Sequence, residues 1–158
     1  MNLKRIGGSL LLVMMMISCK NQNGKILENQ QSLVFQKGEI IENNNFTGNA
    51  FLEMLVYADN INRNSVGNVT FEPGARTNWH SHPNGQIILV IDGKGYYQEK
   101  GSLKRTLKKG DVVKCPPNTQ HWHGASADSE FVQIAITSRV DGPTQWLKAV
   151  SDEEYKLE

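Results

Sequence analysis

Short apolar stretches separated by turn residues recur along most of the chain. From about residue 33 onward, runs rich in Val, Ile, Tyr and Phe alternate with Pro-Gly, Asn-Gly, Asp-Gly, Lys-Gly and Pro-Pro pairs. Regularly spaced short strands with such punctuation are typical of a β-sandwich or a β-barrel. The pattern therefore predicts an all-β domain, with strands within Ala50–Tyr57, Val66–Pro73, Gln86–Ile91, Gly95–Gly101, Asp111–Cys115 and Glu130–Thr137.

Two local patterns predict how strands are connected and how the chain ends. Asp92-Gly93 lies between two apolar runs, and this pair tolerates the positive φ of a tight turn, so it predicts a hairpin there. Near the end of the chain, Ser151 and Glu154 have the spacing of a helix capping box, followed by Tyr155 and Leu157. We therefore expect one short C-terminal helix.

The first residues have the layout of a secretory signal. Lys4 and Arg5 form a short basic start, and the apolar run Leu10–Ile17 follows. That run is too short to span a bilayer as a mature helix. The ending Met-Ile-Ser-Cys resembles a bacterial lipobox, in which the cysteine is lipidated and becomes the mature N-terminus. We predict a lipoprotein signal peptide over residues 1–18 and a lipid anchor at Cys19.

A lipidated Cys19 has consequences for location and for the second cysteine. The anchor would hold the protein at a membrane surface without spanning it. Lys20 follows the cysteine, which by analogy with enteric sorting indicates the outer membrane, with the protein facing the periplasm. Cys115 would then be the one remaining thiol, so it has no intramolecular disulfide partner and is predicted to be a small buried hydrophobe.

Composition fits one folded domain behind a tether. The polar residues 19–32 are predicted to be the tether and residues 33–158 the domain. The chain of 158 residues has 39% hydrophobic and 21% charged residues and a net charge of +1. No basic block is interleaved with aromatic residues, so nucleic acid is not expected as a partner. A small molecule is the expected ligand.

The histidines carry the clearest chemical signal. All four fall in two pairs, His80 with His82 and His121 with His123. On a strand, residues two apart point to one face, whereas Trp79 and Trp122 have the opposite phase. The pairs could be structural or lie at the surface, but two inward imidazoles need partners for four ring nitrogens. A metal ion supplies such partners.

The spacing around these histidines resembles the cupin superfamily. Its first motif matches Gly74-x5-His80-x-His82-x3-Gln86-x6-Gly93, with Gln where the superfamily has Glu. Its second motif matches Gly110-x5-Pro116-x-Asn118-x2-His121, with Asn118 replacing Gly and Ala125 replacing the last Asn. The resemblance implies a small double-stranded β-helix, the cupin jelly roll. It also implies a divalent metal held by His80, His82, Gln86 and His121.

An amide in the carboxylate position changes the charge of such a site. With three neutral imidazoles and the Gln86 amide as ligands, a divalent ion keeps its charge of about +2 and is a stronger Lewis acid. It would favour an anion at an open position, at the cost of weaker metal affinity. Alternatively, Gln86 only makes hydrogen bonds nearby while the three histidines hold the metal.

The fourth histidine and a nearby threonine are the candidate catalytic residues. His123 faces inward beside His121 and is a natural general base, although it could instead be a fifth ligand. Thr77 can place a hydroxyl at the rim of the site, whereas its neighbour Arg76 is expected to face outward.

A narrower resemblance concerns PGARTNWHSHPNGQ and GDVVKCPPNTQHWHGA, together with the closing segment GPTQWLKAVSDEEY. These segments are similar to small manganese-dependent cupins with (R)-selective hydroxynitrile lyase activity, and to the cupin part of carboxymuconolactone decarboxylase-like proteins. The resemblance implies Mn²⁺, with Fe, Ni or Zn left open, and cleavage of a cyanohydrin to an aldehyde and HCN. It implies that His123 moves the hydroxyl proton, that Thr77 assists, and that walls at Gly67, Val69 and Thr137 set substrate choice.

Other functions and the assembly remain open on the sequence. Cupins also serve as metal-dependent dioxygenases and as non-catalytic binding modules, here for a sugar acid or another carboxylate. Family analogy implies a homodimer, in which strands around Leu33–Ile41 and Ala50–Tyr57 could be exchanged between copies. The sequence does not identify the metal or the physiological substrate, and it does not decide the role of His123.

Overall fold

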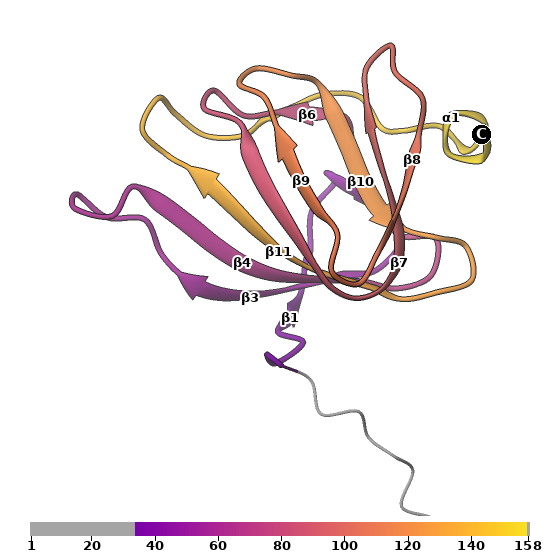
Figure 1. The fold of residues 1–158 in the computed structure, drawn as a ribbon, viewed down its shortest axis with the longest axis horizontal. Coiled ribbons are helices and arrows are strands. Elements are labelled where there is room, and N and C mark those ends of the chain that lie inside the picture. The colour runs from indigo at the N-terminus through magenta and orange to yellow at the C-terminus, as the bar shows by residue number, and fades with distance from the viewer. Residues whose placement is uncertain (1–33, 158) are drawn as a thin grey trace, which may run out of the picture. The chain divides into compact units, whose positions relative to one another are not determined.

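The computed structural model describes residues 34–157, which form a curled antiparallel β-sheet and one short helix (Figure 1). The predicted all-β jelly roll with a C-terminal helix is confirmed. The elements are β1 (Glu39–Ile40), β2 (Phe46–Thr47), β3 (Ala50–Val56), β4 (Asn64–Phe71), β5 (Arg76–Thr77), β6 (His80–Ser81), β7 (Gln86–Glu99), β8 (Arg105–Lys108), β9 (Val112–Cys115), β10 (His121–Ala125), β11 (Phe131–Ser138), β12 (Gln145–Trp146) and α1 (Asp152–Lys156).

The long strand β7 joins the two halves of the barrel. Its first part pairs with β11 and β9, and its second part pairs with β10 and β8. The sheet continues from β11 through β4 and β3 to β1, and from β10 through β5 to β2. The strands β6 and β12 extend the half that contains β10. All of these pairings are antiparallel. Many of the paired strands, such as β4 with β11 and β5 with β10, are far apart in the sequence, so the sheet brings distant residues together.

The hairpin predicted at Asp92-Gly93 is wrong, because β7 runs through this pair as one strand. Gly93 does have a positive φ of 75°, but it pairs with Phe131 beside a bulge at Ile91, where the register with β11 shifts between Val132 and Gln133. The bulge bends β7, so that one strand can pair with both halves of the barrel. The turn that ends β7 lies at Gly101, whose φ is 83°.

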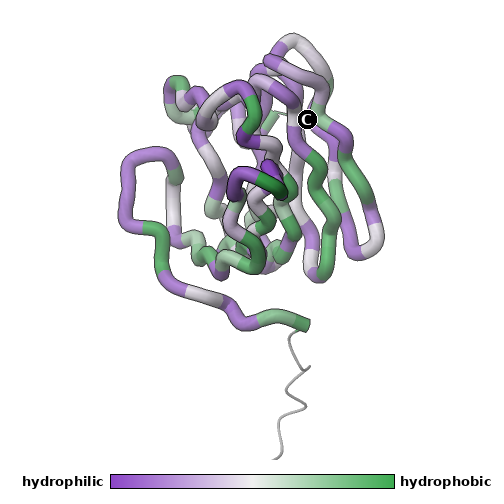
Figure 2. The backbone as a smooth tube through the Cα atoms, turned by 90° about the vertical axis from the view of Figure 1, so that its left-hand side faces the viewer, coloured by the Kyte–Doolittle hydropathy of each residue, from purple (hydrophilic) through white to green (hydrophobic). Residues whose placement is uncertain are grey.

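Side chains alternate between the inside and the outside of the barrel, and hydrophobic and hydrophilic residues alternate along the strands accordingly (Figure 2). The inner core consists of Ala50, Val69, Phe71, Ala75, Ile88, Val90, Tyr97, Leu107, Val113, Cys115, Ala125 and Phe131. Cys115 is 2% exposed, as expected for a small buried hydrophobe. This core packs directly against the histidines, since the ring centroid of Phe71 lies 5.7 Å from that of His123 and the ring centroid of Tyr97 lies 5.5 Å from that of His121.

A second apolar cluster lies outside the barrel and attaches the helix α1. Trp79 and Trp122, in the opposite phase to the histidines, pack there with Val150 and Tyr155. The capping box is present, because Ser151 Oγ accepts from the Glu154 N–H and Glu154 Oε2 accepts from the Ser151 N–H, each at 3.1 Å. The sequence-predicted helix is therefore confirmed, together with its cap.

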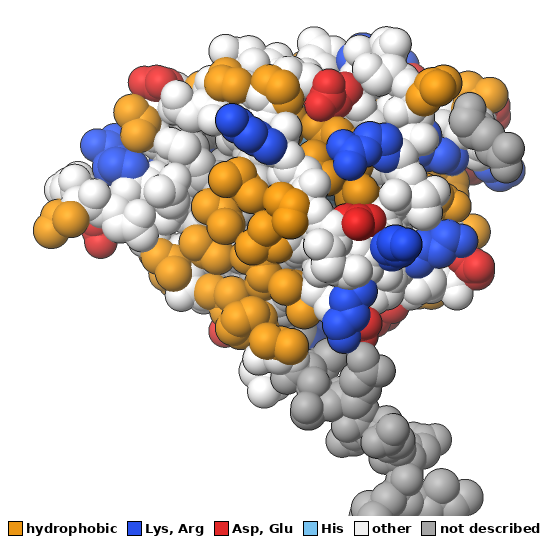
Figure 3. Space-filling view, viewed as in Figure 1, with side chains coloured by type: hydrophobic (Ala, Val, Ile, Leu, Met, Phe, Trp, Pro, Cys, Tyr) orange, Lys and Arg blue, Asp and Glu red, His pale blue; other side chains and the backbone are white. Residues whose placement is uncertain are grey.

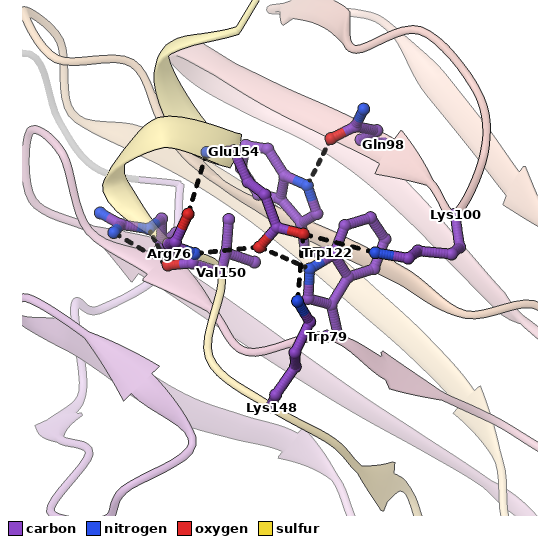
Figure 4. A network of polar contacts seen from close by, with 9 residues as sticks. Arg76, Trp79, Gln98, Lys100, Trp122, Lys148, Val150 and Glu154 are labelled. Atoms are coloured by element: carbon purple, nitrogen blue, oxygen red, sulfur yellow. Dashed lines mark hydrogen bonds and ion pairs between the residues drawn. The ribbon is translucent and has the colours of Figure 1, made fainter.

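The Glu154 carboxylate is the centre of a polar network over this cluster (Figure 4). It accepts hydrogen bonds from Trp79, Lys100 and Lys148. Burial opposes ionisation, but these bonds and the Ser151 N–H outweigh it and lower the pKa of Glu154 to about 2. The carboxylate is therefore charged at neutral pH and ties α1 to the barrel.

Arg76 points away from the interior of the barrel, as expected, but it is not exposed to solvent there. Its side chain is only 5% exposed, because the segment before α1 covers it. The guanidinium donates to the Val150 carbonyl at 3.0 Å and to Asp152 Oδ1 at 2.7 Å. Arg76 thus helps to hold the C-terminal segment against the outer side of β5, which pairs with β10.

Apolar side chains also gather on the outer face of the sheet around β11 (Figure 3). Val66, Ile136 and Ile87 lie side by side on three adjacent strands, and Leu89 pairs with Val112 beside them. Ile87 is 40% and Val112 58% exposed. Contiguous exposed apolar surface often marks an interaction site. The homodimer expected from family analogy remains a prediction.

Several predictions concern residues outside 34–157. The signal peptide over 1–18, the lipid anchor at Cys19, the tether over 19–32 and the start of the predicted first strand at Leu33 all lie outside the described residues. Within 34–157, no helix has the length and apolar composition needed to cross a bilayer. The outer-membrane location therefore stays a prediction.

The bulge beside Gly93 yields a test of the fold. A Cβ at Gly93 would collide with the carbonyl oxygen of Glu130, and a positive φ alone costs an L-residue about 1–2 kcal/mol. We expect Gly93→Ala to lower the free energy of unfolding by more than about 2 kcal/mol in urea denaturation. Gly101→Ala is the matched control, because Gly101 also has a positive φ but no atom within 4 Å of the added Cβ. Equal losses in the two variants would contradict the role of the bulge.

Candidate metal centre

Three of the four histidines converge at one point inside the barrel. His80 begins β6, His82 follows that strand, and His121 begins β10, where it lies opposite His80 in the antiparallel register. One ring nitrogen from each lies within 4.8 Å of those of the other two. All three side chains are buried, with exposures of 1%, 3% and 0%. This spacing suits three ligands of a single metal ion.

Backbone carbonyls determine which ring nitrogen faces that point. His80 Nδ1 lies 2.9 Å from the Asn78 carbonyl and His121 Nδ1 lies 2.9 Å from the Thr119 carbonyl. A carbonyl oxygen can only accept, so both Nδ1 atoms carry the hydrogen and both Nε2 atoms have a free lone pair. His82 Nε2 is buried and has no hydrogen-bond partner among the described residues. These observations fit a site built for a cation.

Gln86 presents its oxygen to the same histidines. Its Oε1 lies 3.3 Å from His121 Nε2, while its Nε2 donates to Thr137 Oγ1 at 3.1 Å. The bond to Thr137 holds the amide with its oxygen facing inward. Gln86 is 7% exposed and begins β7, directly beside Thr137 of β11. The four side chains predicted as ligands are therefore brought together.

Burial keeps these imidazoles uncharged. Desolvation, followed by repulsion from His121 and His123, holds the pKa of His80 well below its usual value of 6.5. Desolvation and then His121 lower the pKa of His82 to about 3, and burial also lowers the pKa of His121. All three are therefore neutral at pH 7, which is the state in which an imidazole binds a metal.

Cys115 lies directly behind one of the three histidines. Its Sγ is 3.1 Å from His121 Nδ1, and burial raises the pKa of the thiol. The thiol is therefore protonated at neutral pH and packs against the ring as a neutral group.

His123 and Thr77 lie next to the three histidines and also line the cavity. The His123 ring is stacked beside His121, with centroids 5.9 Å apart, and it is 4% exposed. Its buried Nδ1 has no hydrogen-bond partner among the described residues. Desolvation, and then repulsion from His121 and His82, holds its pKa well below 6.5. Thr77 Oγ1 accepts from the His123 backbone N–H at 3.1 Å, so its own hydrogen remains available to the cavity.

A cavity of about 130 Å³ opens in front of these residues. Gly67, Val69 and Thr137, predicted as pocket walls, do line it. An apolar cavity of about 150 Å³ can hold benzene. The space therefore suits a molecule about as large as one ring. The remaining wall is mostly apolar and includes Phe46, Leu52, Met54, Phe71, Ala135 and Trp146.

Three further polar residues of the cavity were not predicted. Arg139 donates from Nε to Ser65 Oγ at 3.0 Å and from Nη1 to Thr144 Oγ1 at 3.2 Å. Thr144 Oγ1 in turn lies 3.2 Å from His82 Nδ1. Arg139 follows Thr137 by two residues, so the alternation of β11 could have indicated it. Thr144 could not be found this way, because only the pairing of β12 with β6 brings its segment to the site.

Comparisons with known proteins identify the family of the fold. A family model described as a cupin domain matches residues 67–137. An (R)-mandelonitrile lyase from Granulicella tundricola is 40% identical over 112 residues, which are 70% of this chain and 86% of that protein. The crystal structure of a cupin-like protein from Thermotoga maritima superposes with a TM-score of 0.77 at 51% identity, covering 79% of this chain and 96% of that one.

A more distant structure shares the fold alone. A cupin 2 conserved barrel domain protein from Rhodopseudomonas palustris has a TM-score of 0.59 at 14% identity, covering 73% of this chain and 78% of that one. The 40% identity with the mandelonitrile lyase, which this chain covers over 86% of its length, and the cupin domain model over residues 67–137 show the family. The chain belongs to the cupin family.

Proposed function

We propose that this protein is a metal-dependent carbon–carbon lyase that cleaves a cyanohydrin to an aldehyde and HCN. The observation that carries the proposal is a buried cluster of neutral histidines facing a small cavity, in a chain 40% identical to an (R)-mandelonitrile lyase. The barrel, the cluster and the cavity are properties of the described residues. The reaction and the roles of individual residues are our proposal.

In this proposal the metal ligands are Nε2 of His80, His82 and His121 and Oε1 of Gln86. Hydrogen bonds support this assignment, because Nδ1 of His80 and of His121 donates to a backbone carbonyl and Nε2 of Gln86 donates to Thr137. In these three residues the proposed ligand atoms are the ones that these bonds leave free. Nitrogen and amide-oxygen ligands suit Mn²⁺, which we propose as the ion, and also Fe, Ni and Zn. When bound, a divalent ion supplies a Lewis acid that stabilises the negative charge on the oxygen or on cyanide.

His123 is the residue proposed to move the proton. The substrate O–H proton passes to a ring nitrogen of His123, the carbonyl double bond forms, and the C–C electron pair leaves with cyanide. Cyanide then takes the proton and leaves as HCN, so charge and atoms balance. His123 is neutral at pH 7 and can accept a proton, but its burial disfavours the cation. Proton transfer onward to cyanide therefore accompanies C–C cleavage.

Of the alternative functions, the non-catalytic binding module is the one that the cavity also supports. Among the described residues that line the cavity none is acidic, so the cavity suits a small carboxylate as well as a cyanohydrin. A dioxygenase is disfavoured because such Fe sites usually include a carboxylate ligand. Release of an aldehyde from a cyanohydrin distinguishes the lyase from the binding module, because a binding module would bind the molecule without cleaving it.

The first test compares two neighbouring histidines. We expect the Mn²⁺-loaded protein to release benzaldehyde from mandelonitrile, followed by its ultraviolet absorbance. His123→Ala should keep its metal content and lose about 10²–10⁴-fold in kcat, the usual contribution of a general base. His121→Ala is the matched comparison and should lose the metal itself, measured by elemental analysis.

Two outcomes would contradict these roles. If His123→Ala lost metal as His121→Ala does, His123 would be a ligand and not the base. If the metal-loaded wild-type protein released no aldehyde from any cyanohydrin, the lyase proposal would fail and the binding module would replace it.

The second test concerns the amide ligand. Gln86→Glu would add a negative charge to the ligand set, so the ion should bind at least about tenfold more tightly by titration and be a weaker Lewis acid. We expect kcat for cyanohydrin cleavage to fall at least about tenfold. Thr137→Val, which removes the hydroxyl that anchors the amide but adds no charge, should change both quantities less. An unchanged metal affinity in Gln86→Glu would mean that Gln86 is not a ligand.

The third test concerns pH and the metal-free protein. The folded pKa values of all four histidines lie below 6.5, so below that pH the unfolded chain binds protons that the folded protein does not. The free energy of unfolding should therefore fall as the pH decreases from 6.5 to 5, by up to about 1.4 kcal/mol per pH unit for each histidine. Urea denaturation of EDTA-treated protein at several pH values measures this slope. His123→Phe should have a smaller slope, and a flat profile would contradict the burial of neutral imidazoles.

A further inference from the structure

We propose that Arg139 binds a carboxylate on the substrate, so that the substrates are small aldehydes or cyanohydrins with an acid group away from the reacting carbon. The aldehyde or cyanohydrin end of the substrate rests on the proposed function, whereas the carboxylate site rests on Arg139 and the cavity. Arg139 follows the end of β11, and its side chain lines the cavity that contains the histidines.

The guanidinium of Arg139 is held in place but keeps donors for a ligand. Nε donates to Ser65 Oγ on β4, and Nη1 donates to Thr144 Oγ1 before β12. A guanidinium has five N–H donors in a planar fork. These two bonds use two of them, so one donor on Nη1 and two on Nη2 remain, which is enough to bind the two oxygens of a carboxylate.

Charge also favours an anion at this position. Arg139 is half-buried, and both partners of its side chain are uncharged hydroxyl groups. Every described ion pair involves other residues, and none of the residues 34–157 that line the cavity is an Asp or a Glu. A half-buried charge without a counterion, in a cavity with neutral imidazoles and an amide, attracts a small anion.

The position of Arg139 relative to the histidines sets the orientation of the substrate. Thr144 Oγ1 connects Nη1 of Arg139 to Nδ1 of His82, so the guanidinium is two hydrogen bonds away from a proposed metal ligand. His123 and Thr77 lie on the histidine side of the same cavity. A molecule with its carboxylate on Arg139 would therefore extend its other end toward these residues. The apolar wall, including Val69 and Trp146, would contact the carbon skeleton between its two ends.

A purely structural role for Arg139 makes a different prediction. If it only ties β4 to the segment before β12, its loss should weaken the fold without changing which ligands are preferred. The decisive quantity is therefore a ratio of affinities within one protein variant, because the ratio does not depend on how much of the protein is folded.

The binding test uses two probes of equal shape and different charge, 4-formylbenzoate and 4-formylbenzamide. With Mn²⁺-loaded wild-type protein, calorimetric titration should find 4-formylbenzoate bound about tenfold more tightly, as for a partly exposed charge-assisted pair. In Arg139→Gln the two dissociation constants should become equal, and unchanged binding of the amide shows that the cavity is intact. Arg139→Lys should retain part of the preference, because it keeps the charge but not the planar fork.

Arg63→Gln is the matched control. Arg63 is exposed and lies beside Arg139, because its carbonyl accepts the Arg139 backbone N–H at 2.8 Å. The Arg63 side chain is not among the described residues that line the cavity. This variant should keep the wild-type preference. A wild-type ratio of one would overturn the proposal, and so would a preference that persists in Arg139→Gln, because the carboxylate would then be bound by another group.

The cyanohydrins of the two probes extend the test to turnover. Wild-type protein should have about tenfold higher kcat/KM for the acid than for the amide, and Arg139→Gln should lose this preference. If neither cyanohydrin is cleaved but the binding preference and its loss in Arg139→Gln are observed, the lyase proposal fails and the Arg139 proposal stands. If both are cleaved at equal kcat/KM by the wild type, the Arg139 proposal fails and the lyase proposal stands.

Discussion

The hydrogen bonds behind the imidazoles are the constraint on which the functional part of this protein depends. The carbonyls of Asn78 and Thr119 accept the Nδ1 hydrogens of His80 and His121, and this leaves a lone pair on each Nε2 atom, that of His121 lying 3.3 Å from Gln86 Oε1. His82 adds a third, and its Nε2 has no partner among the described residues. A buried ring nitrogen without a hydrogen-bond partner destabilises the folded state unless an ion or another group binds it. A cation at their meeting point is the simplest group that satisfies all three.

The barrel places these groups by pairing distant segments. His80 and His121 face each other because β6 and β10 are antiparallel neighbours, and Gln86 joins them because β7 lies beside β11. The bulge beside Gly93 lets β7 contribute to both halves of the barrel. The same geometry packs Trp79 and Trp122 outside, where Tyr155 holds the C-terminal helix. Because side chains alternate along the strands, the histidines point into the barrel and the two tryptophans beside them in the sequence point outward, where they pack against the C-terminal helix.

Charge gives the cavity its chemical character. The clustered histidines are neutral, the residue in the usual carboxylate position is the amide Gln86, and Arg139 is the one charged side chain among the described residues that line the cavity. A site of this kind favours negative charge, both the charge that develops when a C–C bond breaks and the charge of a carboxylate on a ligand. The proposed chemistry and the proposed substrate class therefore have one electrostatic origin.

The sequence by itself determined the local features. Alternating runs identified most strands, the Ser151–Glu154 spacing identified the helix, and the paired histidines with Gln86 identified the inward face of the site. Only the tertiary structure decided that Gly93 lies beside a bend within a strand and does not end it, that Arg76 is buried, and that Arg139 and Thr144 reach the cavity. The reason is physical: periodicity and capping are interactions between near neighbours in the chain, whereas these outcomes depend on strand pairing between residues far apart.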